Sequence, residues 1–201
     1  MRTNFQLKEI AALDFRNNKK QLIVSYILRI VGFATFGLLL ALLSHFIYPH
    51  VSLQIDDLIS IKIPGIANWM SIILLIAVVV LVLSLHELIH ATVAFISNGQ
   101  KPKIGMRGLV IFAAAPDSQL SKKALIINAL APFIIISLIG IILIGIIPAS
   151  FVAWIYIPTV VNAGSAGGDF QMVAWSLKHP KGTIYIDQGD ITKAYIRDQE
   201  G

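Results

Sequence analysis

The chain contains no cysteine and carries little charge. Of its 201 residues, 13% are charged and 56% are hydrophobic, and the mean hydropathy is +0.78. Without cysteine there are no disulfide bonds and no thiolate ligands, so a bound metal must be held by nitrogen and oxygen atoms. A soluble globular domain has about 25% charged and about 45–50% apolar residues. The composition therefore excludes an ordinary soluble domain and indicates a protein embedded in a membrane.

Long apolar runs take the place of the missing charge. Four of them reach the ~20 residues that a helix needs to cross ~30 Å of hydrocarbon. We expect an all-α integral membrane protein, a four-helix transmembrane bundle that forms a single domain over residues 1–201. The expected parts are an N-terminal segment at 1–21, spans at 22–47, 69–96, 124–147 and 151–177, and a tail at 178–201.

Basic residues lie on alternate sides of these runs. They gather before the first run, between the second and third, and after the fourth, whereas residues 48–68 contain only Lys62. The positive-inside rule therefore predicts cytoplasmic N- and C-termini. No aromatic residues alternate with the basic ones as in a single-strand-binding surface, so we expect contacts with the lipid bilayer and no binding of nucleic acid.

A short polar motif interrupts the second apolar run. Residues 83–92 read LSLHELIHAT, in which His86 and His90 are four apart and project from one face of a helix. Glu87 points about 100° further around the axis, from where it can reach a water on an ion held by the histidines. Ionisable side chains at membrane depth cost ~2.5–3.5 kcal/mol each and tend to mark function. We favour a metal site over the alternative, a polar contact between helices.

A third ligand is required, because a catalytic zinc uses three protein ligands and one open position. Asp169 is the only carboxylate of the fourth run, as Glu87 is of the second. His86 and Asp169 lie nearly equally far from the outer ends of their spans, which places both in the cytoplasmic half of the bilayer. The matching depth makes Asp169 the candidate third ligand and Zn²⁺ the expected ion.

The segment around Asp169 is poor helix material. VNAGSAGGDF (residues 161–170) is rich in glycine, which predicts a break in the fourth span where that span lines a cavity. Close helix packing alone would explain the glycines but not the aspartate. Asn162 is a candidate substrate-binding residue. Asn128, early in the third run, is a second candidate, which either orients a ligand or an oxyanion or bonds a neighbouring helix.

Three segments outside the spans carry weaker patterns. The apolar RGLVIFAAAP (107–116), set between turn-forming residues, predicts a re-entrant or interfacial β-hairpin between spans 2 and 3. Apolar residues between positions 5 and 15 follow an imperfect helical period, as in an interfacial helix. The tail is polar, with a short β-like run at 183–186, and is expected to cap the site or to bind a partner.

These motifs resemble the site-2 protease family, and more closely a small bacterial branch of membrane zincins. The resemblance covers residues 69–177 and rests on HELIH in a membrane helix, followed two spans later by Asn162 and Asp169 in a glycine-rich span. The usual family motif pairs its asparagine with prolines and follows its aspartate with glycine. Here the run reads NAGSAGGDF, without proline and with phenylalanine after the aspartate.

The resemblance implies roles for the site residues, a way of binding substrate and a location in the cell. It implies that His86, His90 and Asp169 hold zinc, and that Glu87 activates water as a general base. It further implies that an extended substrate pairs with the hairpin near 107–116, and that the protein resides in the bacterial cytoplasmic membrane.

The expected function is therefore that of a zinc-dependent intramembrane metalloprotease acting on a membrane-embedded peptide or protein. Two other functions remain open: a metal-ion transporter or sensor, and a non-catalytic membrane subunit with a structural zinc site. A transporter needs a polar path to both faces, and the outer halves of the second and fourth runs offer few polar residues. Nothing in the sequence indicates an oligomeric state.

Overall fold

Among the residues that the computed structural model describes, four helical segments are long and apolar enough to cross a membrane. They are α1 (Lys19–Ile47), α3 (Asn68–Asn98), α4 (Lys122–Ile146) and the segment Ala149–Leu177. The sequence predicts four such helices, and the described residues contain that number, with ends shifted by a few residues. The structure describes residues 7–49, 55–63, 65–99, 103–107, 110–114, 119–189 and 191–197.

Local sequence explains where the long helices begin and end. The Asn18 side chain accepts hydrogen bonds from the backbone N–H groups of Lys20 and Gln21 and so caps α1. The hydroxyl of Ser121 caps α4 in the same way. Gly99 ends α3 at a φ of +71°, a left-handed conformation that glycine adopts without a steric cost.

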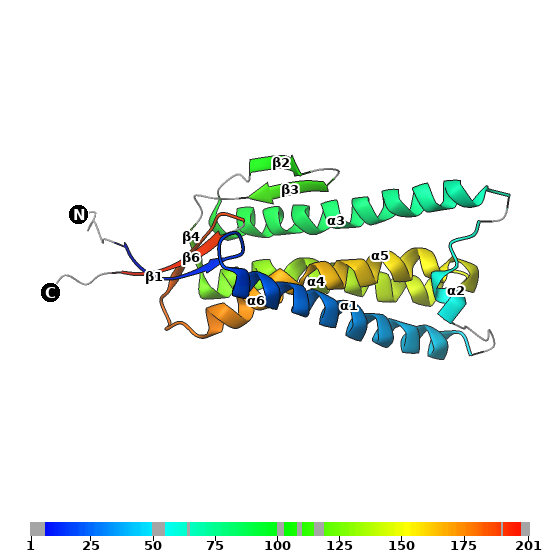
Figure 1. Ribbon diagram of the computed structural model, residues 1–201, viewed down its shortest axis with the longest axis horizontal. Coiled ribbons are helices and arrows are strands. Elements are labelled where there is room, and N and C mark those ends of the chain that lie inside the picture. Colours follow the sequence, from blue (N-terminus) through cyan, green and yellow to red (C-terminus); the bar gives the residue numbers. More distant parts are fainter. Residues whose placement is uncertain are drawn as a thin grey trace.

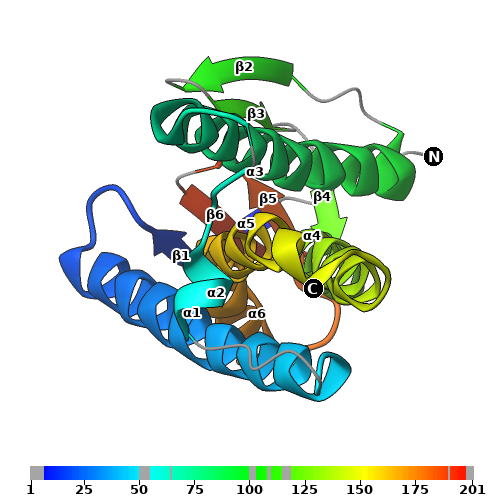
Figure 2. The same ribbon diagram turned by 90° about the vertical axis from the view of Figure 1, so that its right-hand side faces the viewer.

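The fourth span is broken, as the sequence predicts. It consists of a short 3₁₀ turn (Ala149–Phe151), α5 (Val152–Ser165) and α6 (Gly167–Leu177), with the break at Ala166. An end-on view shows α5 inside the bundle, with α1 and α3 on opposite sides of it (Figure 2). Helix α5 packs against α1, α3 and α4, and the short α2 (Ile55–Ile59) also contacts it.

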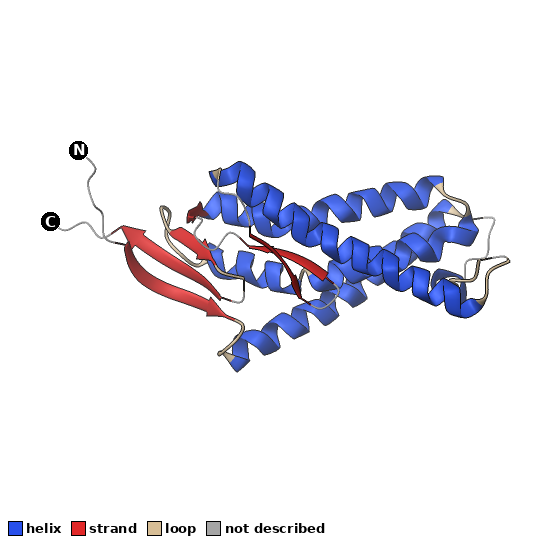
Figure 3. Cartoon of the chain, turned by 90° about the horizontal axis from the view of Figure 1, so that it is seen from above, coloured by secondary structure: helices blue, strands red, loops and turns tan. Residues whose placement is uncertain are grey.

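The prediction of an all-α protein is wrong in one respect, because a four-stranded antiparallel sheet closes one end of the bundle (Figures 1 and 3). Its strands are β1 (Leu7–Asp14), β4 (Gln119–Ser121), β5 (Ile184–Asp187) and β6 (Ile191–Arg197), in the order β1-β6-β5-β4. The interfacial helix expected near the N-terminus is instead strand β1. Its partner β6 comes from the other end of the chain, and a local helical period cannot reveal such a partner.

The predicted hairpin between spans 2 and 3 is present. Strand β2 (Lys103–Arg107) pairs antiparallel with β3 (Val110–Ala114), with Lys103 opposite Ala114. Strand β3 lies against α3, outside the helix bundle (Figure 1). Residues 108, 109, 115 and 116 of the expected segment lie outside the described residues. A re-entrant or interfacial position for the hairpin stays a prediction.

The sheet is part of the same folded unit as the bundle. Buried residues from all four strands pack on α4 and α6 in one apolar cluster: Leu13, Leu120, Leu125, Ala129, Met172, Tyr185 and Ala194. The hydroxyl of Tyr185 donates a hydrogen bond to the carbonyl of Ser176 at 3.1 Å, which joins β5 to α6. Because the tail supplies both Tyr185 and Ala194, the described part of it is anchored to the membrane-embedded helices.

Candidate metal centre

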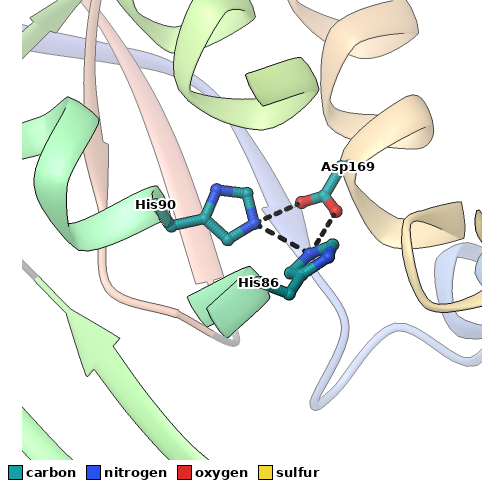
Figure 4. Close-up of side chains that lie close together, drawn as sticks. All are labelled: His86, His90 and Asp169. Atoms are coloured by element: carbon teal, nitrogen blue, oxygen red, sulfur yellow. Dashed lines mark hydrogen bonds and ion pairs between the residues drawn. The ribbon is translucent and has the colours of Figure 1, made fainter. Parts of the chain in front are cut away.

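Two histidines of α3 and an aspartate of α6 meet inside the bundle (Figure 4). The Nε2 atoms of His86 and His90 lie 3.2 Å apart. Asp169 places one carboxylate oxygen 3.3 Å from Nε2 of His86 and the other 3.4 Å from Nε2 of His90. The side chains are largely buried, with 5% of His86 and 15% of each of the other two exposed. The helical spacing of the two histidines and the matching depth of Asp169 thus predicted three side chains that the fold brings together.

The spacing of these atoms allows them to bind one ion. Zn–N and Zn–O bonds of ~2.0–2.1 Å at tetrahedral angles place neighbouring ligand atoms about 3.3 Å apart. The two Nε2 atoms lie 3.2 Å apart, and each lies 3.3 or 3.4 Å from a different oxygen of the Asp169 carboxylate. With one ligand atom taken from each residue, the three atoms lie within 4.8 Å of one another, close enough to bind one ion. The donor set, two imidazoles and a carboxylate, is also one that catalytic zinc sites use, and three protein ligands leave a fourth position open.

The Nδ1 atom of each histidine, on the far side of the ring from the cluster, lies at hydrogen-bond distance from an oxygen atom of another helix. Nδ1 of His86 lies 2.8 Å from Oδ1 of Asn162 on α5, and Nδ1 of His90 lies 2.8 Å from the backbone carbonyl oxygen of Asn128 on α4. A carbonyl oxygen only accepts, so His90 donates through Nδ1 and leaves Nε2 as a lone-pair donor in the neutral ring. With His86 oriented likewise, the lone pairs and the carboxylate face one another, an arrangement that a cation stabilises.

The two asparagines singled out from the sequence therefore both contact the metal cluster. Asn162 is fully buried and Asn128 is 7% exposed. Nδ2 of Asn162 and Oδ1 of Asn128 have no hydrogen-bond partner among the described residues. The structure shows both residues bracing histidines, and binding of substrate by their remaining polar atoms stays a prediction.

Two local features hold Asp169 in place. It sits in the first turn of α6, where the positive end of the helix dipole favours a carboxylate. The neighbouring Phe170 packs edge-on against Phe133 of α4, with ring centroids 5.0 Å apart. This contact gives a structural role to the phenylalanine that distinguishes the chain from the usual Asp-Gly pattern.

Glu87 lies beside the cluster without belonging to it. The metal-type cluster in the described part of the chain contains His86, His90 and Asp169, and Glu87 is absent from it. Glu87 is half-buried on α3 and close enough to both histidines and to Asp169 to interact with them electrostatically. Glu87 is thus a carboxylate close to the cluster but separate from it, and its role as a general base stays a prediction.

Asp187 is an acidic neighbour of the site that the sequence analysis missed. It ends strand β5, and its Oδ1 accepts hydrogen bonds of 3.0 Å from the N–H of Gly189 and from the hydroxyl of Thr192. It interacts electrostatically with His90, Asp169 and Glu87. Burial raises the pKa of Asp187, and the charge of Asp169 adds to the rise. The sequence around it reads as strand and turn, and nothing local indicates that the hairpin folds back towards α3.

A comparison with protein families gives an independent identification of this region. Residues 76–184, more than half of the chain, match the model of a family described as "Putative zincin peptidase". The matched range contains all three cluster residues and Glu87. The chain matches no curated protein and no solved structure.

Proposed function

Because the chain belongs to the zincin peptidase family, we propose that it is an intramembrane zinc protease with Glu87 as its general base. The observation that carries the proposal is the cluster of His86, His90 and Asp169, whose ligand atoms lie within 4.8 Å of one another and form a donor set that catalytic zinc sites use. Its position within helices long and apolar enough to cross a membrane supports cleavage at or near membrane depth.

Hydrolysis of a peptide bond at this site requires a bound ion and one side chain that moves a proton from water to the leaving amine. Zinc bound at the cluster lowers the pKa of water towards ~7 and polarises a peptide carbonyl. A Glu87 carboxylate oxygen accepts a proton from the attacking water, whose oxygen bonds to the carbonyl carbon. The same carboxyl group then donates that proton to the amine nitrogen as the C–N bond breaks.

The surrounding residues keep the ligands ready for this step. Asn162 and the carbonyl of Asn128 fix the ring orientation of His86 and His90, so little reorganisation is needed during the reaction. Asp169 is held by the start of α6 and by the packing of Phe170. The broken fourth span supports a local cavity, because irregular backbone at membrane depth is tolerated where it is buried or lines one.

The β2–β3 hairpin is the proposed substrate guide. A peptide must be extended to enter a protease site, and a strand edge binds extended peptides through backbone hydrogen bonds. The hairpin lies along α3, the helix that carries both histidines and Glu87 (Figure 1). The unpartnered Nδ2 of Asn162 and Oδ1 of Asn128 are proposed to bond the substrate backbone.

The test is Glu87→Gln in purified protein reconstituted in lipid. We expect wild type and Glu87→Gln to contain near one zinc per chain, and His90→Ala and Asp169→Ala to lose most of it. Cleavage of membrane-spanning peptides, followed by mass spectrometry, should fall by roughly 10²–10⁴-fold in Glu87→Gln. Glu9→Gln is the matched control, because Glu9 is exposed and pairs with Lys193 in the sheet, and it should cleave like the wild type.

Two results would contradict the proposal. Folded wild type without zinc would mean that the cluster is a polar contact between helices. Full activity of Glu87→Gln would remove the assigned base. Zinc that binds as expected, with a cellular function that survives Glu87→Gln, would instead support the structural-zinc or transport alternatives.

A further inference from the structure

A basic cavity of about 640 Å³ opens beside the sheet, at the end of the bundle where α4 begins. No residue of the candidate metal centre is among its described lining residues. The cavity lies between the β4–α4 junction, the turn before β5 and the end of β6. Its lining residues are Gln119, Leu120, Ser121, Lys122, Lys123, Lys181, Gly182, Thr183, Ile184 and Arg197.

The pairing of the strands brings these three segments together. Ser121 on β4 pairs with Ile184 on β5, and Ile184 pairs with Tyr195 on β6. Because β5 lies between β4 and β6, the turn before β5 (Lys181–Gly182) lies between the start of α4 and the end of β6, and all three segments line the cavity. The convergence of basic residues is thus a consequence of the sheet, although they are far apart in the sequence.

The charge of the cavity is of one sign. Four lining residues are cationic, and no acidic residue is among the described ones that line it. Lys123, Lys181 and Arg197 are exposed, whereas Lys122 is half-buried and donates a hydrogen bond to the carbonyl of His179. The cavity also faces the first turn of α4, where backbone N–H groups lack acceptors within the helix and the dipole favours an anion.

The cavity lies where a membrane surface is expected. The apolar part of α4 begins at Ala124, directly after the two lysines. On neighbouring α6, Trp175 packs edge-on against His179, with ring centroids 4.5 Å apart, and tryptophan is enriched at the level of lipid headgroups. Basic pockets at this level bind phosphorylated headgroups.

We infer that this cavity is a specific site for a phosphate group, carried by an anionic phospholipid. Lys123, Lys181 and Arg197 supply the charge, and the open side of the cavity admits the headgroup while the acyl chains remain beside α4. The site is separate from the candidate metal centre, so the inference does not depend on the proposed protease activity.

The test is a titration of the detergent-purified protein with a short-chain phosphatidylglycerol, with binding measured by native mass spectrometry. The variant Lys123→Gln/Lys181→Gln/Arg197→Gln should bind at least about tenfold more weakly. The matched control, Arg16→Gln/Lys19→Gln/Lys20→Gln, loses the same charge at the start of α1 and should bind within about twofold of the wild type. Lys123→Gln/Lys181→Gln, which leaves β6 intact, should retain helix content and still bind more weakly.

Two further binding measurements identify the molecule that carries the phosphate group. Phosphatidylcholine should bind far more weakly, and millimolar inorganic phosphate should not displace phosphatidylglycerol. If inorganic phosphate displaces phosphatidylglycerol and the site shows no preference for the lipid, the ligand is a soluble phosphate compound. That result would contradict the inference of a phospholipid. Equal losses in the two triple variants would show diffuse attraction to basic residues and overturn the site.

Discussion

The two histidines of HELIH differ in what braces them. Nδ1 of His86 is held by a side chain, Oδ1 of Asn162, whereas Nδ1 of His90 is held by the backbone carbonyl of Asn128. A substitution can remove the first brace but not the second. The pair therefore offers an internally controlled test of the metal centre.

Asn162→Ala should weaken zinc binding by about 10–100-fold, because losing the hydrogen bond that orients a ligand histidine typically costs that much. Asn128→Ala should change zinc affinity by only a few-fold, since the carbonyl that holds His90 remains. Competition with a chromogenic chelator measures both affinities. A larger loss in Asn128→Ala than in Asn162→Ala would contradict the assigned bracing.

His179 gives the molecule a pH-dependent stability. Its Nδ1 lies 3.2 Å from the hydroxyl of Tyr185, beside Lys122 and Lys178. Burial lowers the pKa of His179 below its usual value of about 6.5, and the two lysines lower it further. The unfolded chain then binds more protons than the folded one as the pH falls through ~6.5, so this residue reduces stability at acidic pH.

We expect the wild type to melt at a lower temperature at pH 5.5 than at pH 7.5, and His179→Gln to show a smaller difference. Thermal unfolding followed by circular dichroism in detergent measures this. His45→Gln is the matched control, because His45 is exposed in the last turn of α1, at the end of the bundle away from the sheet (Figure 1). An unchanged pH difference in His179→Gln would show that other groups cause it.

At the level of elements, the break in the fourth span depends on one close approach. A Cβ atom built on Gly167 would lie 2.5 Å from the backbone nitrogen of Arg29 and 2.9 Å from its Cα, so α6 and α1 meet there with no room for a side chain. Asp169 is two residues further along α6. We therefore expect this glycine to determine where Asp169, the candidate metal ligand, lies.

Gly167→Ala should destabilise the protein by about 1–3 kcal/mol, the usual cost of overpacking, and should weaken zinc binding by moving Asp169. Gly145→Ala is the matched control, because a Cβ on that helical glycine meets nothing within 4 Å. The melting temperature and the zinc content of both variants measure the effect. Equal zinc content in Gly167→Ala and wild type would separate the helix contact from the metal centre.

Elements specified by local sequence were predicted well. The apolar length of the helices, the glycine-rich break and the β-forming residues at 110–114 are all visible in short windows. Strand β1 was not, because its period is ambiguous and its partner β6 lies at the opposite end of the chain. Likewise, the sequence shows that Gly167 is a glycine, but not that Arg29 of another helix lies against it.

At the level of the whole molecule, the cluster of His86, His90 and Asp169 could be predicted because the position of a residue along an expected span gives its depth in the membrane. Position along a span gives depth, and depth placed Asp169 level with His86 before any fold was known. Outside the spans, the position of a residue in the sequence gives no such measure of where it lies. The approach of Asp187 to the site and the convergence of Lys123, Lys181 and Arg197 follow from sheet pairing and from the packing of the sheet on the helices.

The sheet also constrains how the protein lies in a membrane. Strands β1 and β6 pair along their length, so residues near both ends of the chain must lie on the same side, whichever side that is. Asp56, on the short α2 between the first two spans, must lie on the opposite side. The positive-inside rule predicts that the side with the sheet faces the cytoplasm.

Because the chain has no cysteine, single cysteines can test this without background. Lys8→Cys and Lys181→Cys should react with a membrane-impermeant maleimide only after the cells are permeabilised, whereas Asp56→Cys should react in intact cells. The cysteine-free parent is the control. The reverse pattern would invert the orientation but keep the fold. Different behaviour of Lys8→Cys and Lys181→Cys would contradict the sheet itself, because a strand pair cannot join two sides of a bilayer.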